Sequence, residues 1–171
     1  ERYEGNAQGF RVLTRLQMPD NDGGMQLTSA TLGAFVKYPV ESLTPRRADS
    51  FSKKFNFFQD DKALFEAVAE HTGLLRLDDS LSVWTRHPLA FLVEAADDIC
   101  YTIVDFEDGH SLGIISYEEL EKSFMEIIAD DYCRKKVLDL QEPQRKAEFL
   151  RAMALNTLVK QLSECFIAHE E

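Results

Sequence analysis

The chain is poor in cysteine, and this shortage excludes several kinds of site. Its 171 residues include only three cysteines, Cys100, Cys133 and Cys165, which lie far apart and form no CxxC pair and no Cys/His cluster. A structural zinc site is therefore not expected. Buried, reduced thiols are the simplest interpretation, and they predict a cytoplasmic protein.

Basic residues are also scarce, with 19 Lys and Arg against 30 Asp and Glu, for a formal net charge of −11. This charge disfavours broad electrostatic binding to nucleic acid or to an anionic membrane. It leaves room for a small anionic ligand that is held by a metal ion and a few local cations. No apolar run reaches the length of a membrane span, and no signal peptide is visible.

The sequence lacks any β-hairpin signal and any internal repeat, and its apolar residues recur at helical spacing. Ser116 and Glu119 form a capping box, and Gly73 and Gly109 are expected to end helices. Helices are expected over about residues 3–17, 29–37, 60–71, 88–108, 117–129, 131–140 and 142–168. The sequence therefore predicts an all-α fold, with residues 1–171 as a single helical segment without an internal boundary.

The region from about residue 40 to residue 59 has no clean period and is expected to be a long loop. Long loops inside compact domains are often functional. This one carries the densest basic patch of the chain, which consists of Arg46, Arg47, Lys53 and Lys54.

An acidic stripe runs along the expected helix that begins at Pro88. At about 100° per residue, the polar side chains of this helix fall within one arc of roughly 100°. The stripe consists of Glu94, Asp97, Asp98, Tyr101, Asp105 and Asp108. Glu107 is the one acidic residue of the helix that lies outside it.

The wide apolar remainder of this helix predicts that it is largely buried. Carboxylates on a buried helix need a partner because unpaired charges are costly away from water, and a metal cation is the simplest partner. The alternative is an ordinary solvated outer face.

Two segments of the chain resemble a known family. They are Tyr3–Arg11 and Arg86–Asp108, the second of which contains Glu94-Ala95-Ala96-Asp97-Asp98. Both resemble segments of the bacterial deoxyguanosinetriphosphate triphosphohydrolases and their dNTPase relatives, within the HD-domain phosphohydrolases. Two further segments, Thr31–Pro39 and Lys53–Phe58, resemble the same family in the same order. The resemblance implies the C-terminal portion of an HD-domain-like helical bundle.

The resemblance implies hydrolysis of a deoxynucleoside triphosphate to the deoxynucleoside and inorganic triphosphate, with a divalent metal such as Mg, Mn, Fe or Co. Asp97 corresponds to the family's distant metal-binding Asp, because Tyr101 follows it by four residues. Tyr101 and Asp105 then correspond to pocket positions, and all three share one helix face at i, i+4 and i+8. Tyr101 would bind a phosphate oxygen or the sugar, whereas the alternative is a half-buried helix tyrosine.

The resemblance also implies that Lys37 and Lys54 bind the triphosphate as point charges, and that Asn6 contacts the nucleotide or supports the site. The alternatives are solvated surface lysines and a polar residue on a helix surface. Arg151 is a weaker phosphate-binding candidate, because no motif accompanies it. Relatives of this family are often homo-oligomers, and some respond to nucleotide or DNA effectors, so both kinds of partner are expectations.

One departure from the family is clear, because the chain contains no His-Asp dipeptide. The family's two metal-binding histidine positions lie before the Tyr3–Arg11 motif, with which this chain begins. We therefore expect a fragment that lacks the N-terminal His and His-Asp part, and we expect the catalytic acid/base residues upstream of Glu1. Such a fragment alone is expected to be inactive.

Three hypotheses follow. The first is part of a triphosphohydrolase, and the second is a non-catalytic helical module of the same fold that regulates or binds other proteins. The third, an unrelated bundle with a carboxylate-bridged metal pair, would need a Glu-x-x-His motif, which the sequence lacks. A His and a later His-Asp upstream of Glu1 would support the first, and their absence would exclude it.

Overall fold

The computed structural model describes residues 3–44 and 54–169 and contains two compact units, Glu1–Val93 and Glu94–Glu171. The boundary lies within one long helix, α4 (Pro88–Ser111). The helical pattern of the sequence continues across this boundary and does not indicate it. Arg46, Arg47 and Lys53 of the basic loop lie outside the described residues.

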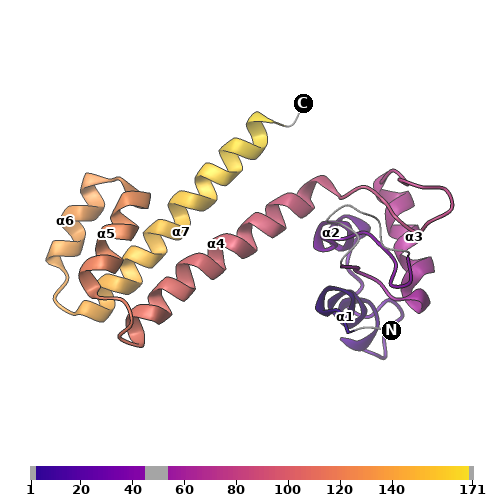
Figure 1. The fold of residues 1–171 in the computed structure, drawn as a ribbon, viewed down its shortest axis with the longest axis horizontal. Coiled ribbons are helices and arrows are strands. Elements are labelled where there is room, and N and C mark those ends of the chain that lie inside the picture. Colours follow the sequence, from indigo (N-terminus) through magenta and orange to yellow (C-terminus); the bar gives the residue numbers. More distant parts are fainter. Residues whose placement is uncertain (1–2, 45–53, 170–171) are drawn as a thin grey trace. The chain divides into compact units, whose positions relative to one another are not determined.

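The N-terminal unit consists of short helices joined by irregular segments (Figure 1). Its elements before α4 are α1 (Gly5–Arg11), the π-helix η1 (Val12–Leu16), α2 (Ser29–Phe35), the 3-10 helix η3 (Gln59–Asp61) and α3 (Lys62–Thr72). Within the described ranges, extended pairing is limited to isolated bridges such as Val40 with Val83. The all-α prediction is therefore confirmed.

Aromatic side chains form the core of the N-terminal unit. The Phe57 and Phe65 rings are stacked with centroids 4.4 Å apart, and the Trp84 ring meets Phe65 edge-on at 5.3 Å. Phe10 from α1 packs against Phe65 at 6.0 Å. All four rings are buried. Their contacts join α1 and α3 to the irregular segments around Phe57 and Trp84.

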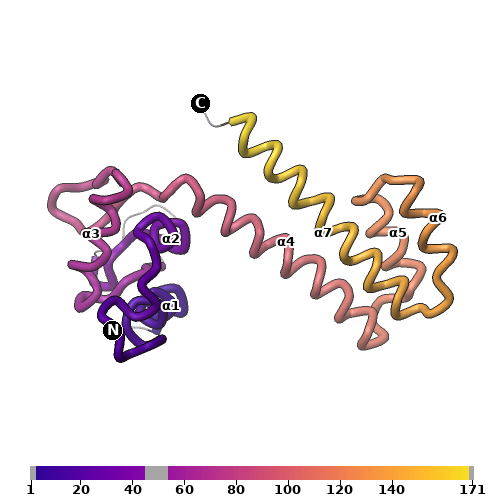
Figure 2. The backbone as a smooth tube through the Cα atoms, turned by 180° about the vertical axis from the view of Figure 1, so that it is seen from behind, coloured from indigo at the N-terminus to yellow at the C-terminus, as the bar shows by residue number. Residues whose placement is uncertain are grey.

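The C-terminal unit is a helical bundle formed by the second half of α4, α5 (Tyr117–Ile128), α6 (Asp131–Asp139) and α7 (Pro143–Ala168). Figures 1 and 2 show α5 and α6 beside α7, in agreement with their contacts. The core residues from the four helices are Ile103, Leu120, Phe124, Ile128, Cys133, Val137, Ala147, Leu150 and Ala154. No helix of the described residues is long and apolar enough to span a membrane.

Most helix boundaries agree with the sequence, and the exceptions have local causes. Gly73 ends α3 in the left-handed region, with φ 70°, as expected. Gly109, predicted to end α4, instead lies inside it, where a Cβ would come within 2.8 Å of the Ile115 side chain. The left-handed turn after α4 is made by Gly113, with φ 73°. Helix α2 is capped by Thr28 and ends at Phe35, two residues before the expected end near residue 37.

Helix α4 is far more exposed than its composition suggested. Ala90 and Ile103 are its only buried members, while Phe91 is 53% exposed. The prediction of a largely buried helix was therefore wrong for this structure. Cys100 on the same helix and Cys165 on α7 are also exposed, so buried thiols were correctly predicted only for Cys133.

The predicted capping box at the start of α5 is present. The Ser116 hydroxyl accepts the Glu119 backbone N–H at 3.2 Å, and the Glu119 carboxylate accepts the Ser116 backbone N–H at 3.0 Å. The hydrogen bonds that the Ser116 backbone N–H and hydroxyl donate to the Glu119 carboxylate lower the pKa of Glu119. Because the folded pKa lies below the unfolded one, this stabilisation is present above the unfolded pKa and is lost as the pH falls through the folded pKa.

Ser116→Ala is expected to lower the free energy of unfolding of the C-terminal unit by about 1 kcal/mol, because it leaves the Glu119 N–H without its acceptor. Urea denaturation followed by far-UV circular dichroism measures the change. Ser163→Ala is the matched control, because this exposed mid-helix serine bonds only to the Val159 carbonyl and alanine is the better helix former. Equal effects of the two variants would reject the role of the cap.

Candidate functional site

The structure brings the segments that carry Lys37 and Lys54 together in the N-terminal unit. The Asn56 Oδ1 atom accepts the Tyr38 backbone N–H at 2.6 Å, and the Asn56 backbone N–H donates to the Val40 carbonyl at 3.1 Å. Lys54 Nζ lies 5.3 Å from the centroid of the Tyr38 ring, which is within the range of a cation–π contact. Lys37 directly precedes Tyr38 in the chain, so the segments that carry the two predicted phosphate-binding lysines meet at Tyr38.

A second cation, Arg86, lies against the same ring. Its guanidinium carbon is 5.5 Å from the Tyr38 centroid and 5.4 Å from the Phe91 centroid. Sequence reasoning quoted Arg86 as the start of a motif without assigning it a role. Two positive charges at one ring, Lys54 and Arg86 at Tyr38, favour the binding of an anion, although the chain as a whole is strongly acidic.

Asn6 hydrogen-bonds to its neighbour Glu4, as expected if it is an ordinary polar residue of a helix. Its side-chain Nδ2 donates to Glu4 Oε1 at 2.7 Å, and its backbone N–H donates to the same oxygen at 3.3 Å. Glu4 is thus the N-cap of α1, and the Asn6 amide holds the capping carboxylate in place. This geometry accounts for Asn6 without a ligand, although it leaves a supporting role at the site as a prediction.

Close packing accounts for two glycines in the motifs that resemble the family. A Cβ on Gly9 would lie 2.8 Å from the Phe35 ring, and one on Gly33 would lie 3.1 Å from the His87 ring. His87 in turn accepts the Leu89 backbone N–H at its Nδ1 atom, at 3.1 Å, and so caps the start of α4. Part of each motif therefore serves to pack and end helices.

The acidic stripe lies on one continuous helix, as predicted. Asp97, Tyr101 and Asp105 are all exposed on α4, with Tyr101 64% exposed, and they recur at i, i+4 and i+8. The Asp97 and Asp105 carboxylates are exposed and so do not need a partner to offset burial. In this structure they lie on a solvated face of α4, which is the alternative considered above. The assignment of Asp97 as a metal ligand consequently depends on the family resemblance alone.

The chemistry of the donors permits only a partial fit to a metal. Asp97 offers carboxylate oxygens, which hard divalent cations prefer. Within residues 3–44 and 54–169, however, His, Cys, Asp and Glu side chains form no group of three or more that could hold a metal ion. The described residues therefore do not form a metal site of three or more such ligands by themselves.

Two residues outside the motifs satisfy each other. Arg151 Nη1 of α7 lies 2.6 Å from Glu107 Oε2 of α4, and Glu107 is only 13% exposed. This ion pair explains why Glu107 lies off the acidic stripe. It also gives Arg151 a structural role within the C-terminal unit, and the phosphate contact considered for it stays a prediction.

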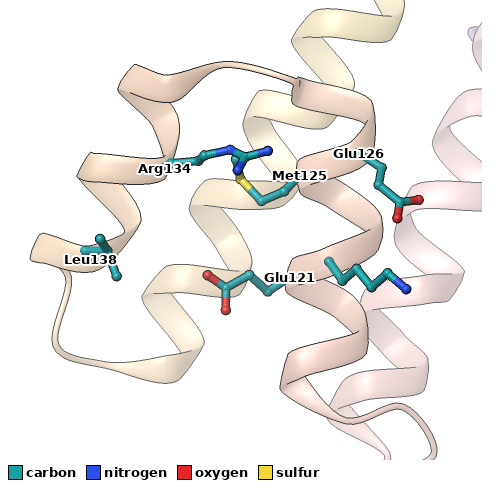
Figure 3. A pocket seen from close by; sticks show the side chains of 6 residues that line it. Glu121, Met125, Glu126, Arg134 and Leu138 are labelled. Atoms are coloured by element: carbon teal, nitrogen blue, oxygen red, sulfur yellow. The ribbon is translucent and has the colours of Figure 1, made fainter.

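One hollow of the C-terminal unit does not include a candidate residue. Figure 3 shows its lining side chains on α5 and α6. The volume of the hollow is about 440 Å³. Its walls carry charges of both signs, and they consist of Glu121, Lys122, Met125, Glu126, Arg134 and Leu138. A mixed, open wall of this kind indicates no particular ligand.

Comparison with known proteins identifies relatives along the whole chain. A deoxyguanosinetriphosphate triphosphohydrolase-like protein of Synechocystis is 45% identical over 99% of the chain, and one of Pseudomonas aeruginosa is 37% identical over 99%. A deoxyguanosinetriphosphate triphosphohydrolase of Enterobacter is 30% identical over 97%. The chain spans 39%, 38% and 34% of these relatives. No family model matches the chain.

Proposed function

Because this chain belongs to the family of deoxyguanosinetriphosphate triphosphohydrolase-like proteins, we propose that it forms part of an enzyme that hydrolyses deoxynucleoside triphosphates. The products would be the deoxynucleoside and inorganic triphosphate. The observation that carries the proposal is the similarity to relatives of this name over 99% of the chain. The cluster of Lys54 and Arg86 at the Tyr38 ring supports it, because a triphosphate needs several cations.

Each candidate residue has a role in this proposal. Lys37 and Lys54 would bind the triphosphate oxygens as point charges and offset their repulsion from the acidic chain. Tyr101 would donate its phenolic O–H to a phosphate oxygen or contact the sugar, and Asp105 would accept a hydrogen bond from the nucleoside. Asn6 would support the site through the start of α1.

Asp97 would be one ligand of a divalent metal. When bound, such a metal supplies a nucleophilic hydroxide and offsets the negative charge that builds on the phosphate. We propose that the remaining ligands and the catalytic acid/base residues belong to the part of the relatives' length that this chain does not cover. A homo-oligomer, a nucleotide or DNA effector and a cytoplasmic location are further proposals from the same resemblance.

A non-catalytic module of the same fold is the second candidate. One observation favours it, which is that Asp97, Tyr101 and Asp105 are exposed on α4, as on an ordinary solvated face. Such a module would bind a deoxynucleoside triphosphate without releasing triphosphate. Assay of the complete protein with dGTP and added Mn²⁺ separates the two, because only the enzyme produces inorganic triphosphate.

Lys54→Ala and Lys37→Ala are each expected to raise the KM for a deoxynucleoside triphosphate about tenfold, because each removes a charge that binds phosphate. Steady-state release of inorganic triphosphate by the complete protein gives KM and kcat. Lys135→Ala, an exposed lysine of α6, is the control and is expected to leave both constants unchanged. Kinetics like those of the unchanged protein in both variants would reject the phosphate role.

A further inference from the structure

We propose that Asn56 is a positioning residue that holds Lys37 and Lys54 for anion binding, through Tyr38. The inference rests on the proposed function, since it concerns how the two phosphate-binding lysines are arranged. The Asn56 side chain is a fully buried amide of the N-terminal unit, with an exposed fraction of 0%.

The Asn56 side chain fixes the peptide group that joins Lys37 to Tyr38. Its Oδ1 atom accepts the N–H of that peptide at 2.6 Å, a short contact for an amide acceptor. The rotation of this peptide group sets the direction in which the Lys37 side chain leaves the backbone. Asn56 itself follows Lys54 by two residues, so one side chain joins the two lysine segments.

The Tyr38 ring completes the connection on the side of Lys54. The ammonium group lies 5.3 Å from the ring centroid, and the Arg86 guanidinium carbon lies 5.5 Å from the same centroid. A ring attracts such cations through its negative face. Fixing the Tyr38 backbone therefore fixes the surface against which Lys54 rests.

The amide nitrogen of Asn56 indicates that stability alone does not explain an asparagine at this position. Its Nδ2 atom is buried and has no hydrogen-bond partner among the described residues. A buried donor of this kind destabilises the fold, because it has lost its hydrogen bonds to water. The buried amide is therefore best explained by the hydrogen bond that its oxygen accepts, which holds the Lys37–Tyr38 peptide group in place.

The test measures binding of inorganic triphosphate to the complete protein by isothermal titration calorimetry, without added metal. Asn56→Leu keeps the number and branching of the side-chain heavy atoms but removes the acceptor, and it is expected to raise the Kd about tenfold. In a Lys37→Ala/Lys54→Ala background the same change is expected to alter the Kd less than about twofold, because the groups it positions are gone. An equal effect in both backgrounds would overturn the proposal.

Thr14→Val is the matched control for stability. It removes another buried side-chain hydrogen bond of the same unit, from Thr14 Oγ1 to the Phe10 carbonyl at 2.8 Å, and it should leave triphosphate binding unchanged. If Asn56→Leu does not fold, Tyr38→Leu and Tyr38→Phe test the same connection. Leu should weaken binding severalfold and Phe should preserve it, and equal affinities would reject the connection.

The outcomes separate the two proposals. If the Lys37→Ala/Lys54→Ala variant binds triphosphate as tightly as the unchanged protein, the proposed phosphate role of the lysines fails. If that variant loses binding while Asn56→Leu retains it, only the positioning role of Asn56 fails.

Discussion

Arg11→Met is expected to lower the free energy of unfolding of the N-terminal unit by about 3 to 5 kcal/mol. Asp61 is fully buried, and its Oδ2 atom lies 2.9 Å from both Nε and Nη2 of Arg11. The substitution keeps an apolar stem over the Phe58 ring, which the guanidinium carbon contacts at 4.5 Å. It leaves the buried carboxylate with Arg15 alone, whose Nε lies 2.9 Å from Oδ1.

Urea unfolding followed by the fluorescence of Trp84, the single tryptophan of the chain, reports on this unit directly, because its ring belongs to the same core. Asp61→Asn in the Arg11→Met background should recover part of the loss, since it removes the uncompensated charge. Arg134→Met is the control, because its exposed pair with Asp131 at 3.9 Å contributes less than about 1 kcal/mol. A loss of that small size for Arg11→Met would show that the buried carboxylate does not depend on Arg11.

The helices could be predicted from the sequence because their signals are local. The capping box of Ser116 and Glu119, the Pro143 start of α7 and the left-handed Gly73 each act within one turn of a helix end. Gly109 was misinterpreted because a local signal, a glycine near a helix end, was taken as the end of α4. The glycine is instead needed because a Cβ at this position would meet the Ile115 side chain, which comes close only after the chain has turned back at Gly113.

The contacts that organise the candidate site could not be predicted in this way. Arg11 and Asp61 are 50 positions apart in the sequence, and no periodic pattern relates Asn56 to the Tyr38 N–H. The resemblance identified the segments that contain these residues, but it did not distinguish ligand-binding side chains from those that hold the segments together. Arg11 and Gly9 lie in a motif that resembles the family, yet their observed contacts are structural.

The exposure of α4 has a direct consequence for the metal assignment. A wide apolar arc predicts burial only if another surface covers it, and within this chain part of that arc is exposed, including Leu89, Val93 and Val104. The argument from buried carboxylates therefore does not support a metal at Asp97. A functional measurement on the complete protein has to decide the assignment, and the chain offers a close control for it.

Asp97→Ala is expected to lower the metal-dependent release of inorganic triphosphate by the complete protein at least about 100-fold. Loss of groups that merely orient a metal ligand costs 10- to 100-fold, so loss of a ligand itself should cost more. The fold should survive, because Asp97 is exposed on α4 and alanine favours a helix. Release of triphosphate from dGTP with added Mn²⁺ measures the activity, and circular dichroism measures the helix content.

Asp98→Ala is the matched control, because it removes an equally exposed carboxylate from the adjacent position. Asp98 does not share the i, i+4, i+8 line of Asp97, Tyr101 and Asp105, so its loss should reduce activity less than about tenfold. A general electrostatic role of the stripe would instead give both variants similar losses, since each removes one negative charge from the same face. Activity that survives Asp97→Ala would reject the metal assignment, whatever the effect at Asp98.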